Sequence, residues 1–197
     1  MRKVTVSEFV SLDGVMQAPG GVDEDTDGGF AHGGWTGPYW HDDIGAQIFQ
    51  AMSDCDTLLV GRKTWQGHAA AFEPMPADDP FGNMRKVVVS TTLKSASAWR
   101  NSSIISQNVV DEIRKLKEQP GKDIYVDGSS VLVHTLVQAD LVDEYSLLVF
   151  PLVLGSGKQV FPDGFRADLK LIETKSFPTG VVLMRYQPAK ADHKQGE

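Results

Sequence analysis

Two short segments of this sequence could bind phosphate, because each runs from a β-branched strand into a glycine followed by hydroxyl or basic residues. The first spans residues 57–64 around Gly61, and the second spans residues 124–130 around Gly128. A helix that begins just after a buried strand points free backbone N–H groups outward, and glycine lets a phosphate approach that backbone closely. The two segments therefore predict two phosphate-binding turns on one sheet, able to hold the two ends of a dinucleotide.

A third strand end carries hydroxyl groups in the same way. The predicted strand 86–90 ends at Ser90 and is followed by Thr91. Taken alone, residues 61–64 are typical of a surface turn with a helix cap. Three neighbouring strand ends that present hydroxyl groups or bare backbone on one side are explained more simply by one shared ligand.

The composition limits the possible functions. The chain has 197 residues and is 41% hydrophobic, enough for one sizeable core, so we predict a single domain over residues 1–188 and a frayed polar tail over 189–197. The net charge of −7 argues against a general nucleic-acid-binding protein, because such binding needs clustered Lys and Arg. An anionic ligand must instead meet local cations, and Arg62 with Lys63 forms one such pair.

Several kinds of site and location are excluded by what the sequence lacks. The single cysteine, Cys55, rules out a disulfide framework and a multi-cysteine zinc site, and the five histidines stand in no metal-binding pattern, so no metal is expected. The acidic run 23–28 lacks the glutamate that completes a calcium loop, and residues 155–158 lack the earlier glycine of a P-loop. No apolar run is long enough to cross a membrane or resembles a signal peptide, so we expect a cytoplasmic protein without a membrane partner.

The elements that must position these residues alternate between strands and helices. Hydrophobic periodicity and turn residues predict, in order, strand 2–10, a long loop 11–40, helix 43–55 with Asp42 as N-cap, strands 57–60, 86–90 and 103–106, helix 109–119, strand 123–126, helix 131–137, strand 142–150, and a hairpin of 169–177 with 181–186. This order predicts an α/β fold whose mixed sheet is covered by helices on both faces. The long loop is a candidate binding lip.

The order of the motifs resembles that of the dihydrofolate reductase-like family. Residues 58–65 and 86–92 are similar to the two cofactor-binding strand ends of dihydrofolate reductase. Residues 11–14, 141–144, 151–158 and 160–161 are similar to the reductase domain of the bacterial bifunctional riboflavin-biosynthesis deaminase-reductase. The resemblance spans residues 2 to 187 and implies a three-layer fold with a mostly parallel sheet and a C-terminal antiparallel hairpin.

The resemblance also implies how NADPH would be bound. It assigns the cofactor to Val60, Gly61, Arg62, Lys63 and Thr64, with Arg62 on the 2′-phosphate and Lys63 beside it. Ser90 and Thr91 would flank the same phosphate. The pyrophosphate would lie at a helix start formed by Gly128, Ser129, Ser130 and Val131.

On the substrate side, the resemblance places the nicotinamide near the loop 11–14. Asp13 is the predicted catalytic acid, although Asp42 and Asp43 remain alternative sources of the proton. Trp40 and Phe49 would form an apolar floor for a substrate ring, and Asp42 and Asp43 complete the predicted substrate site. Dihydrofolate reductase has a carboxylate on its first helix, but the corresponding position is Gly45 here, which argues against a folate substrate.

The function expected from this resemblance is an NADPH-dependent reductase of the riboflavin-biosynthesis type. Its substrate would be a small heterocycle similar to a ribosylaminopyrimidine, and the chain would carry no deaminase half, since that half needs several cysteines. Two alternatives stay open, a pterin or dihydrofolate reductase and a non-catalytic nucleotide-binding protein of the same fold. A homodimer that binds only small molecules is expected in each case.

Overall fold

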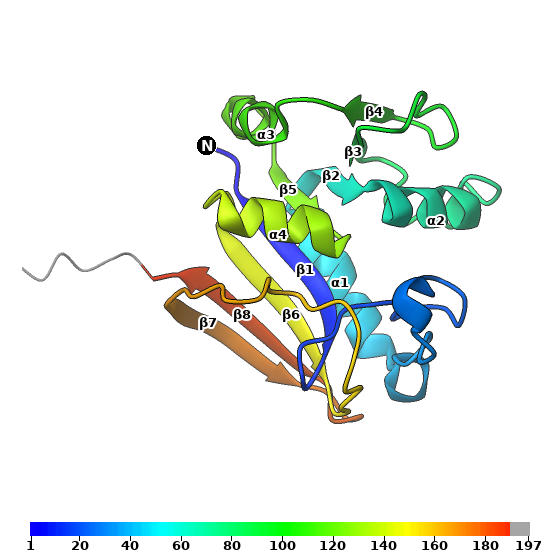
Figure 1. Ribbon diagram of the computed structural model, residues 1–197, viewed down its shortest axis with the longest axis vertical. Coiled ribbons are helices and arrows are strands. Elements are labelled where there is room, and N and C mark those ends of the chain that lie inside the picture. The colour runs from blue at the N-terminus through cyan, green and yellow to red at the C-terminus, as the bar shows by residue number, and fades with distance from the viewer. Residues whose placement is uncertain (190–197) are drawn as a thin grey trace, which may run out of the picture.

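The chain folds into three layers, with one eight-stranded sheet between two layers of helices (Figure 1). The computed structural model describes residues 1–189. Its strands are β1 (Val4–Ser11), β2 (Cys55–Gly61), β3 (Arg85–Val89), β4 (Ser102–Ile105), β5 (Asp123–Val126), β6 (Glu144–Phe150), β7 (Leu169–Ser176) and β8 (Val182–Pro188). Its helices are α1 (Asp42–Ser53), α2 (Arg62–Phe72), α3 (Val109–Glu118) and α4 (Ser130–Gln138). The predicted α/β fold with a mixed sheet is confirmed.

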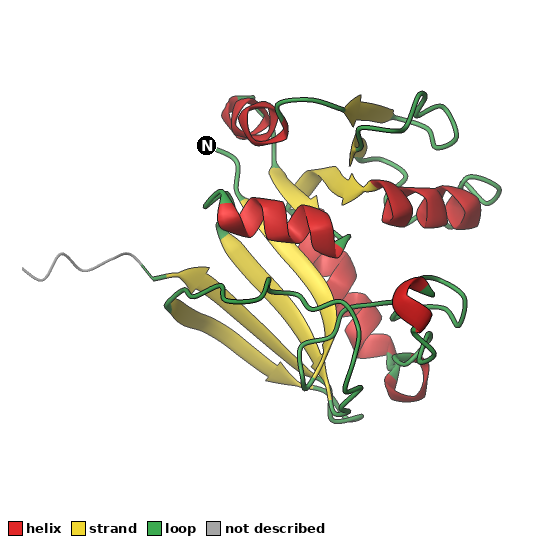
Figure 2. Cartoon of the chain, viewed as in Figure 1, coloured by secondary structure: helices red, strands yellow, loops and turns green. Residues whose placement is uncertain are grey.

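The strand order is β4-β3-β2-β5-β1-β6-β8-β7, and every neighbouring pair from β4 to β6 is parallel. Strands β6 and β8 pair antiparallel, as do β7 and β8, so the predicted hairpin forms one edge of the sheet (Figure 2). Parallel strands end at the same edge of a sheet. The carboxyl ends of β3, β2 and β5 are therefore neighbours.

Each face of the sheet has its own hydrophobic core because side chains alternate along the strands. Val4, Val6 and Ile124 pack with Ile113 of α3 and Leu136 of α4 on one face. On the other face, α1 and α2 cover two further clusters, one centred on Trp65 and Trp99 and one on Trp35 and Phe150. Figure 1 shows α4 and α1 on opposite sides of the sheet.

The long loop between β1 and α1 is tied down by buried side chains. Trp35 donates from its indole N–H to the carbonyl of Gln17 at 2.8 Å and packs edge-on against Phe150, with ring centroids 5.3 Å apart. Two 3-10 turns, Asp27–Gly29 and Gly37–Tyr39, lie within this loop. The loop is therefore held against the sheet on the side of α1 and α2.

Two boundary predictions for the first helix were wrong. Helix α1 begins at Asp42 itself, and its N-cap is His41, whose Nδ1 accepts a hydrogen bond from the Asp43 amide at 3.2 Å. Cys55 was assigned to this helix from its spacing, but it starts β2 and its side chain is buried. The helical and strand periods coincide at an apolar residue between two elements, so spacing alone could not place Cys55.

Two further findings concern membrane-spanning helices and the C-terminal residues. Within residues 1–189, no helix combines the length and the apolar character needed to cross a membrane. The frayed tail was predicted over residues 189–197, and residues 190–197 of it lie outside the described residues. The amide of Ala189 donates to the carbonyl of Asp168 at 2.8 Å.

Candidate functional site

The junctions β2–α2 and β5–α4 touch each other directly at the carboxyl edge of the sheet. The Gly61 amide donates to the carbonyl of Gly128 at 3.1 Å. A Cβ atom on Gly61 would lie 2.0 Å from Oγ of Ser129, and one on Gly128, whose φ is +65°, would lie 2.8 Å from Oγ1 of Thr64. Glycine at both positions lets the two turns touch.

Both helices that start at this edge lack a side-chain cap. Gly61 is the N-cap of α2 and has no side chain, and Ser129 caps α4 without a side-chain hydrogen bond. The first amides of a helix have no partner within the helix, and they carry a partial positive charge. The structure thus brings together two uncapped helix starts. At this edge the side chain of Val60 is buried, that of Thr64 is half-buried and that of Val131 is exposed. This arrangement can bind an anion.

The third strand end lies beside β2 and forms a hollow rather than a helix start. The Ser90 amide donates to the carbonyl of Ile105, and its hydroxyl accepts from the amides of Thr92 and Leu93 at 3.2 and 3.0 Å. The Ser90 hydroxyl therefore serves its own turn. Thr91 is exposed and borders a hollow of about 580 Å³, whose other lining residues are Leu93, Lys94, Ile104, Ser106 and Gln107.

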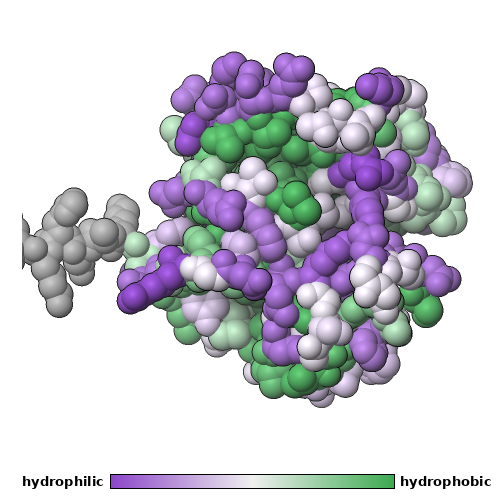
Figure 3. All heavy atoms as spheres, in the orientation of Figure 1, coloured by the Kyte–Doolittle hydropathy of each residue, from purple (hydrophilic) through white to green (hydrophobic). Residues whose placement is uncertain are grey.

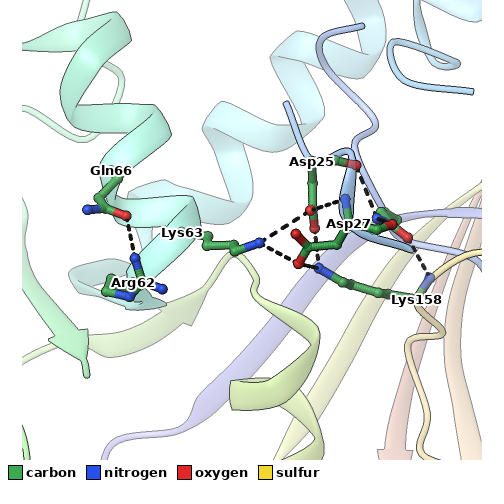
Figure 4. A network of polar contacts seen from close by, with 7 residues as sticks. Asp25, Asp27, Arg62, Lys63, Gln66 and Lys158 are labelled. Carbon is green, nitrogen blue, oxygen red and sulfur yellow. Dashed lines mark hydrogen bonds and ion pairs between the residues drawn. The ribbon is translucent and has the colours of Figure 1, made fainter. Parts of the chain in front are cut away.

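Arg62 and Lys63 point in different directions from the first turn of α2 (Figure 4). Nη1 of Arg62 donates to Oε1 of Gln66 at 2.9 Å, and no carboxylate among residues 1–189 pairs with this guanidinium. Nζ of Lys63 forms ion pairs with Asp27 and, at 3.6 Å, with Asp25. The two cations therefore do not converge on one point, because the long loop supplies Lys63 with carboxylates.

The same two aspartates are bound from the other side by Lys158. Its Nζ lies 2.8 Å from Oδ2 of Asp27 and also pairs with Asp25. Gln17 completes the network, since its amide nitrogen donates to the carbonyls of Asp25 and Asp27 and its Oε1 accepts from the Lys158 amide. We call Asp25, Asp27, Lys63 and Lys158 the ionic clasp. It joins the long loop to α2 and to the segment before β7 (Figure 4).

The Asp27 carboxylate of the ionic clasp stays ionised over a wide pH range. Hydrogen bonds from Lys158 and then from Lys63 lower the pKa of Asp27 to about 2. Hydrophilic residues cover the surface between the start of α2 and the long loop, whereas apolar side chains gather between α3 and α4 (Figure 3). The ionic clasp therefore lies along one side of the candidate site. Its two aspartates balance the charges of its two lysines.

Asp13 is held in its loop by hydrogen bonds. Its carboxylate accepts from the Ser11 hydroxyl at 2.6 Å and from the amides of Leu154 and Gly155 at 3.1 and 2.7 Å. The Ser11 hydrogen bond, with the two amides, lowers the pKa of Asp13 to about 2. These hydrogen bonds favour the ionised form of Asp13, which argues against its predicted role as the catalytic acid.

The predicted substrate residues of α1 do not form one surface. Trp40 is 46% exposed and meets Phe9 of β1 edge-on, and Asp42 and Asp43 are exposed in the first turn, near the carboxyl edge of the sheet. Phe49 lies two turns further along α1, about 10 Å away. It borders a hollow of about 430 Å³ with Cys55, at the start of β2. That hollow is at the amino edge, so the placement of Phe49 in the same site was wrong.

Sequence reasoning missed a buried carboxyl group beside the Gly128 turn. Glu8 of β1 accepts a hydrogen bond from the Gly128 amide at 2.8 Å and is 7% exposed. Burial, together with the charge of Asp127, raises the pKa of Glu8 well above its ordinary value of 4.5. The signal was present, because Val4, Val6 and Val10 mark the buried positions of β1 and Glu8 occupies the same alternation.

A second missed feature is a hydrogen bond between α2 and the end of β5. Nε2 of His68 lies 2.8 Å from Oδ2 of Asp127, the residue directly before Gly128. The side chains are 24% and 31% exposed, respectively. Asp127 follows a predicted strand in the same way as Gly61, but His68 could be linked to it only through the fold, since 59 residues separate them.

Comparisons with known proteins assign the chain to one domain family. The model of the family described as the RibD C-terminal domain matches residues 2–183. Protein YyaP of Bacillus subtilis (strain 168), described as uncharacterised, is 30% identical over 191 residues, which cover 94% of each chain. A Shewanella sp. PV-4 protein provisionally assigned to riboflavin biosynthesis has a TM-score of 0.70 at 19% identity, with 95% of this chain and 99% of that chain covered.

The fold is also that of dihydrofolate reductase. The enzyme from Enterococcus faecalis, solved in complex with NADP(H) and RAB-propyl, has a TM-score of 0.62 at 15% identity. The likeness covers 95% of this chain and 97% of the other. At such low identities the two solved structures establish the fold alone. The family model adds a match in sequence over residues 2–183.

We predict that Glu8→Gln changes how stability depends on pH. The folded protein binds a proton at Glu8 between pH 4.5 and its raised pKa, so wild-type stability falls as the pH rises through this range. Each unit of that pKa difference is worth about 1.4 kcal/mol. Glutamine cannot ionise, so the variant should gain on the wild type with rising pH in urea unfolding. Parallel curves for the two proteins would contradict this reading, and the exposed Glu118→Gln is the control.

We also predict that Lys158→Met loosens the long loop. Loss of the cation leaves Asp25 and Asp27 with Lys63 alone, so amides of residues 21–29 should exchange with solvent about fivefold faster, whereas Lys158→Arg should restore protection. About 0.5 M sodium chloride should act on the wild type in the same direction. Because the pKa of Asp27 is about 2, the protection should persist at pH 4 and be lost only as the pH falls from 3.8 through 2. Equal exchange rates in wild type and Lys158→Met would show that the ionic clasp does not stabilise the long loop.

Proposed function

This chain belongs to the RibD C-terminal domain family, and we propose that it is an NADPH-dependent reductase acting on a small nitrogen heterocycle similar to a ribosylaminopyrimidine. The observation that carries the cofactor part of the proposal is the contact between Gly61 and the Gly128–Ser129 turn. It leaves two uncapped helix starts side by side, because the glycines let the two turns touch. Such a cradle fits the phosphates of a dinucleotide.

The residues present at this edge fit the parts of NADPH. Amides of Ser129, Ser130 and Val131 would receive the pyrophosphate, with the hydroxyl of Thr64 beside them. Arg62, which has no carboxylate partner within residues 1–189, is suited to bind the 2′-phosphate bidentately. The hollow next to Thr91 would hold the adenosine end. Lys94, which borders that hollow, would add a second cation that sequence reasoning had not identified.

The bound cofactor would supply a hydride, and the protein would supply position and a dry environment. Phe9 and Trp40 provide an apolar corner next to the end of β1. The ionic clasp holds the long loop against the same side, which would limit the access of water to the reacting atoms. These features support hydride transfer to a C=N or C=O bond.

A ribosylaminopyrimidine-like substrate is favoured over a folate by the structure of α1. Gly45 offers no carboxylate, and a Cβ there would lie 3.5 Å from the ring of Trp40, so this face of α1 is occupied by an aromatic side chain. The family assignment points in the same direction. We propose in addition that the protein acts in the cytoplasm as a homodimer, for which edge strand β7, with the exposed Leu171 and Ile172, offers a surface.

We predict that Arg62→Ala weakens NADPH binding by about 10-fold to 100-fold, the range for loss of a charged hydrogen bond, and leaves NADH binding unchanged. Titration calorimetry with both cofactors measures this directly. Arg114→Ala is the matched control, since Arg114 lies on α3 and pairs with Asp111 in its own helix. An unchanged preference for NADPH in Arg62→Ala would remove the assigned phosphate contact.

Turnover tests the rest of the proposal. We expect oxidation of NADPH, followed by its absorbance, in the presence of an aminopyrimidine carrying a ribosylamino group, and little or none with dihydrofolate. Tight NADPH binding without turnover of any heterocycle would instead favour a non-catalytic nucleotide-binding protein. Absence of NADPH binding would reject the proposed function altogether.

A further inference from the structure

Lys63 is the member of the ionic clasp that belongs to α2, the helix whose start forms part of the proposed phosphate cradle. Asp25 and Asp27 lie in the long loop, and Lys158 lies in the segment before β7. Figure 4 shows the Lys63 side chain extending from the first turn of α2 toward the two aspartates. The ion pairs of Lys63 are therefore a link between the long loop and the cofactor side of the candidate site.

At the loop end of this link, the two aspartates do not depend on Lys63 alone. Nζ of Lys158 lies 2.8 Å from Oδ2 of Asp27 and also pairs with Asp25. Gln17 donates to the carbonyls of both aspartates at 3.1 and 3.0 Å, and its Oε1 accepts from the Lys158 amide at 3.1 Å. If Lys63 leaves, both carboxylates keep a cation, and the loop stays joined to the segment before β7.

The helix end of the link lies at the cradle. Lys63 is the second residue of α2 and precedes Thr64, whose Oγ1 would lie 2.8 Å from a Cβ atom on Gly128. The Lys63 side chain is 46% exposed, and lysine carries its charge on a flexible stem. The ammonium can therefore turn from the loop toward a phosphate at its own helix start. It cannot bind both anions closely, because the carboxylates and a pyrophosphate would then repel each other.

We propose that Asp25 and Asp27 act as an internal anion that competes with the phosphates of the cofactor for Lys63, so that cofactor binding releases the long loop from α2. This inference rests on the proposed function and adds a regulation of the same site. When the phosphates take Lys63, the loop keeps its link to Lys158 and loses its link to α2. The coupling is reciprocal, because a loop that holds Lys63 weakens cofactor binding by the same factor. Release of the loop by the cofactor favours entry of the substrate after the cofactor.

The other acids of this part of the loop do not take part in the link. The Glu24 carboxylate accepts from the amides of Gly20 and Gly21 at 2.7 and 3.0 Å. Asp23 is exposed and forms no ion pair within residues 1–189. The lysine hydrogen bonds lower the pKa of Asp27 to about 2, so Asp27 competes as an anion at neutral pH. Asp23→Asn is therefore the matched control, since it removes the same charge from the same loop without freeing a lysine.

The first test is a double-mutant cycle on the full chain, with NADPH affinity measured by titration calorimetry. Asp27→Asn should tighten NADPH binding by about threefold or more, the range for loss of a competing exposed ion pair. In a Lys63→Met background the same substitution should change the affinity no more than Asp23→Asn does in the wild type. Melting temperatures of all variants show whether they fold.

The second test is hydrogen exchange of the amides of residues 21–29 with and without saturating NADPH. A bound ligand ordinarily slows exchange in the loops that it contacts, whereas release from α2 should make exchange of this segment about threefold faster in the wild type. Lys63→Met has already lost the link, so its loop should exchange fast at the start and respond little to NADPH.

Two outcomes would overturn the inference alone while NADPH still binds. One is unchanged or slower exchange of residues 21–29 in the wild type on addition of NADPH. The other is an effect of Asp27→Asn on affinity that equals that of Asp23→Asn or persists in the Lys63→Met background. A wild type that binds no NADPH would reject the proposed function, and this inference with it, so the two failures are distinguishable.

Discussion

The close approach of the β2–α2 and β5–α4 junctions is the constraint on which the candidate site depends. Adjacent strands of a sheet are only about 4.8 Å apart, so two chains that turn outward together leave no room for a side chain between them. Gly61 and Gly128 meet this requirement, and the Gly61 amide bonds to the carbonyl of Gly128. Both helices consequently start at the same place, with their positive ends toward the same space.

The charges around this space are arranged locally, although the chain as a whole is acidic. Asp25 and Asp27 neutralise Lys63 and Lys158 within the ionic clasp, which leaves Arg62 as the cation of the β2–α2 turn that no described carboxylate engages. The raised pKa of Glu8 favours its neutral form directly beneath the second turn. Carboxylates near the cradle are thus paired or have a raised pKa, which reduces their repulsion of an anionic ligand.

Much of the fold was predictable from local patterns, because the strands and helices alternate with clear hydrophobic periods. The convergence of three strand ends followed from the same reasoning, since parallel neighbours end together, and the order β3-β2-β5 confirms it. Side-chain partners were harder to predict. Lys63 and Asp27 are 36 residues apart, and Asp13 meets Leu154 and Gly155 across more than 140 residues, so only the folded chain reveals these contacts.

The most direct test of the shared cradle is the response of backbone amides to NADPH in two-dimensional NMR. The account predicts large shifts for the amides of Gly61, Arg62, Ser129, Ser130 and Val131, with both turns changing at the same ligand concentration. Shifts confined to one turn, or centred on the hollow at the amino edge near Phe49 and Met84, would contradict it.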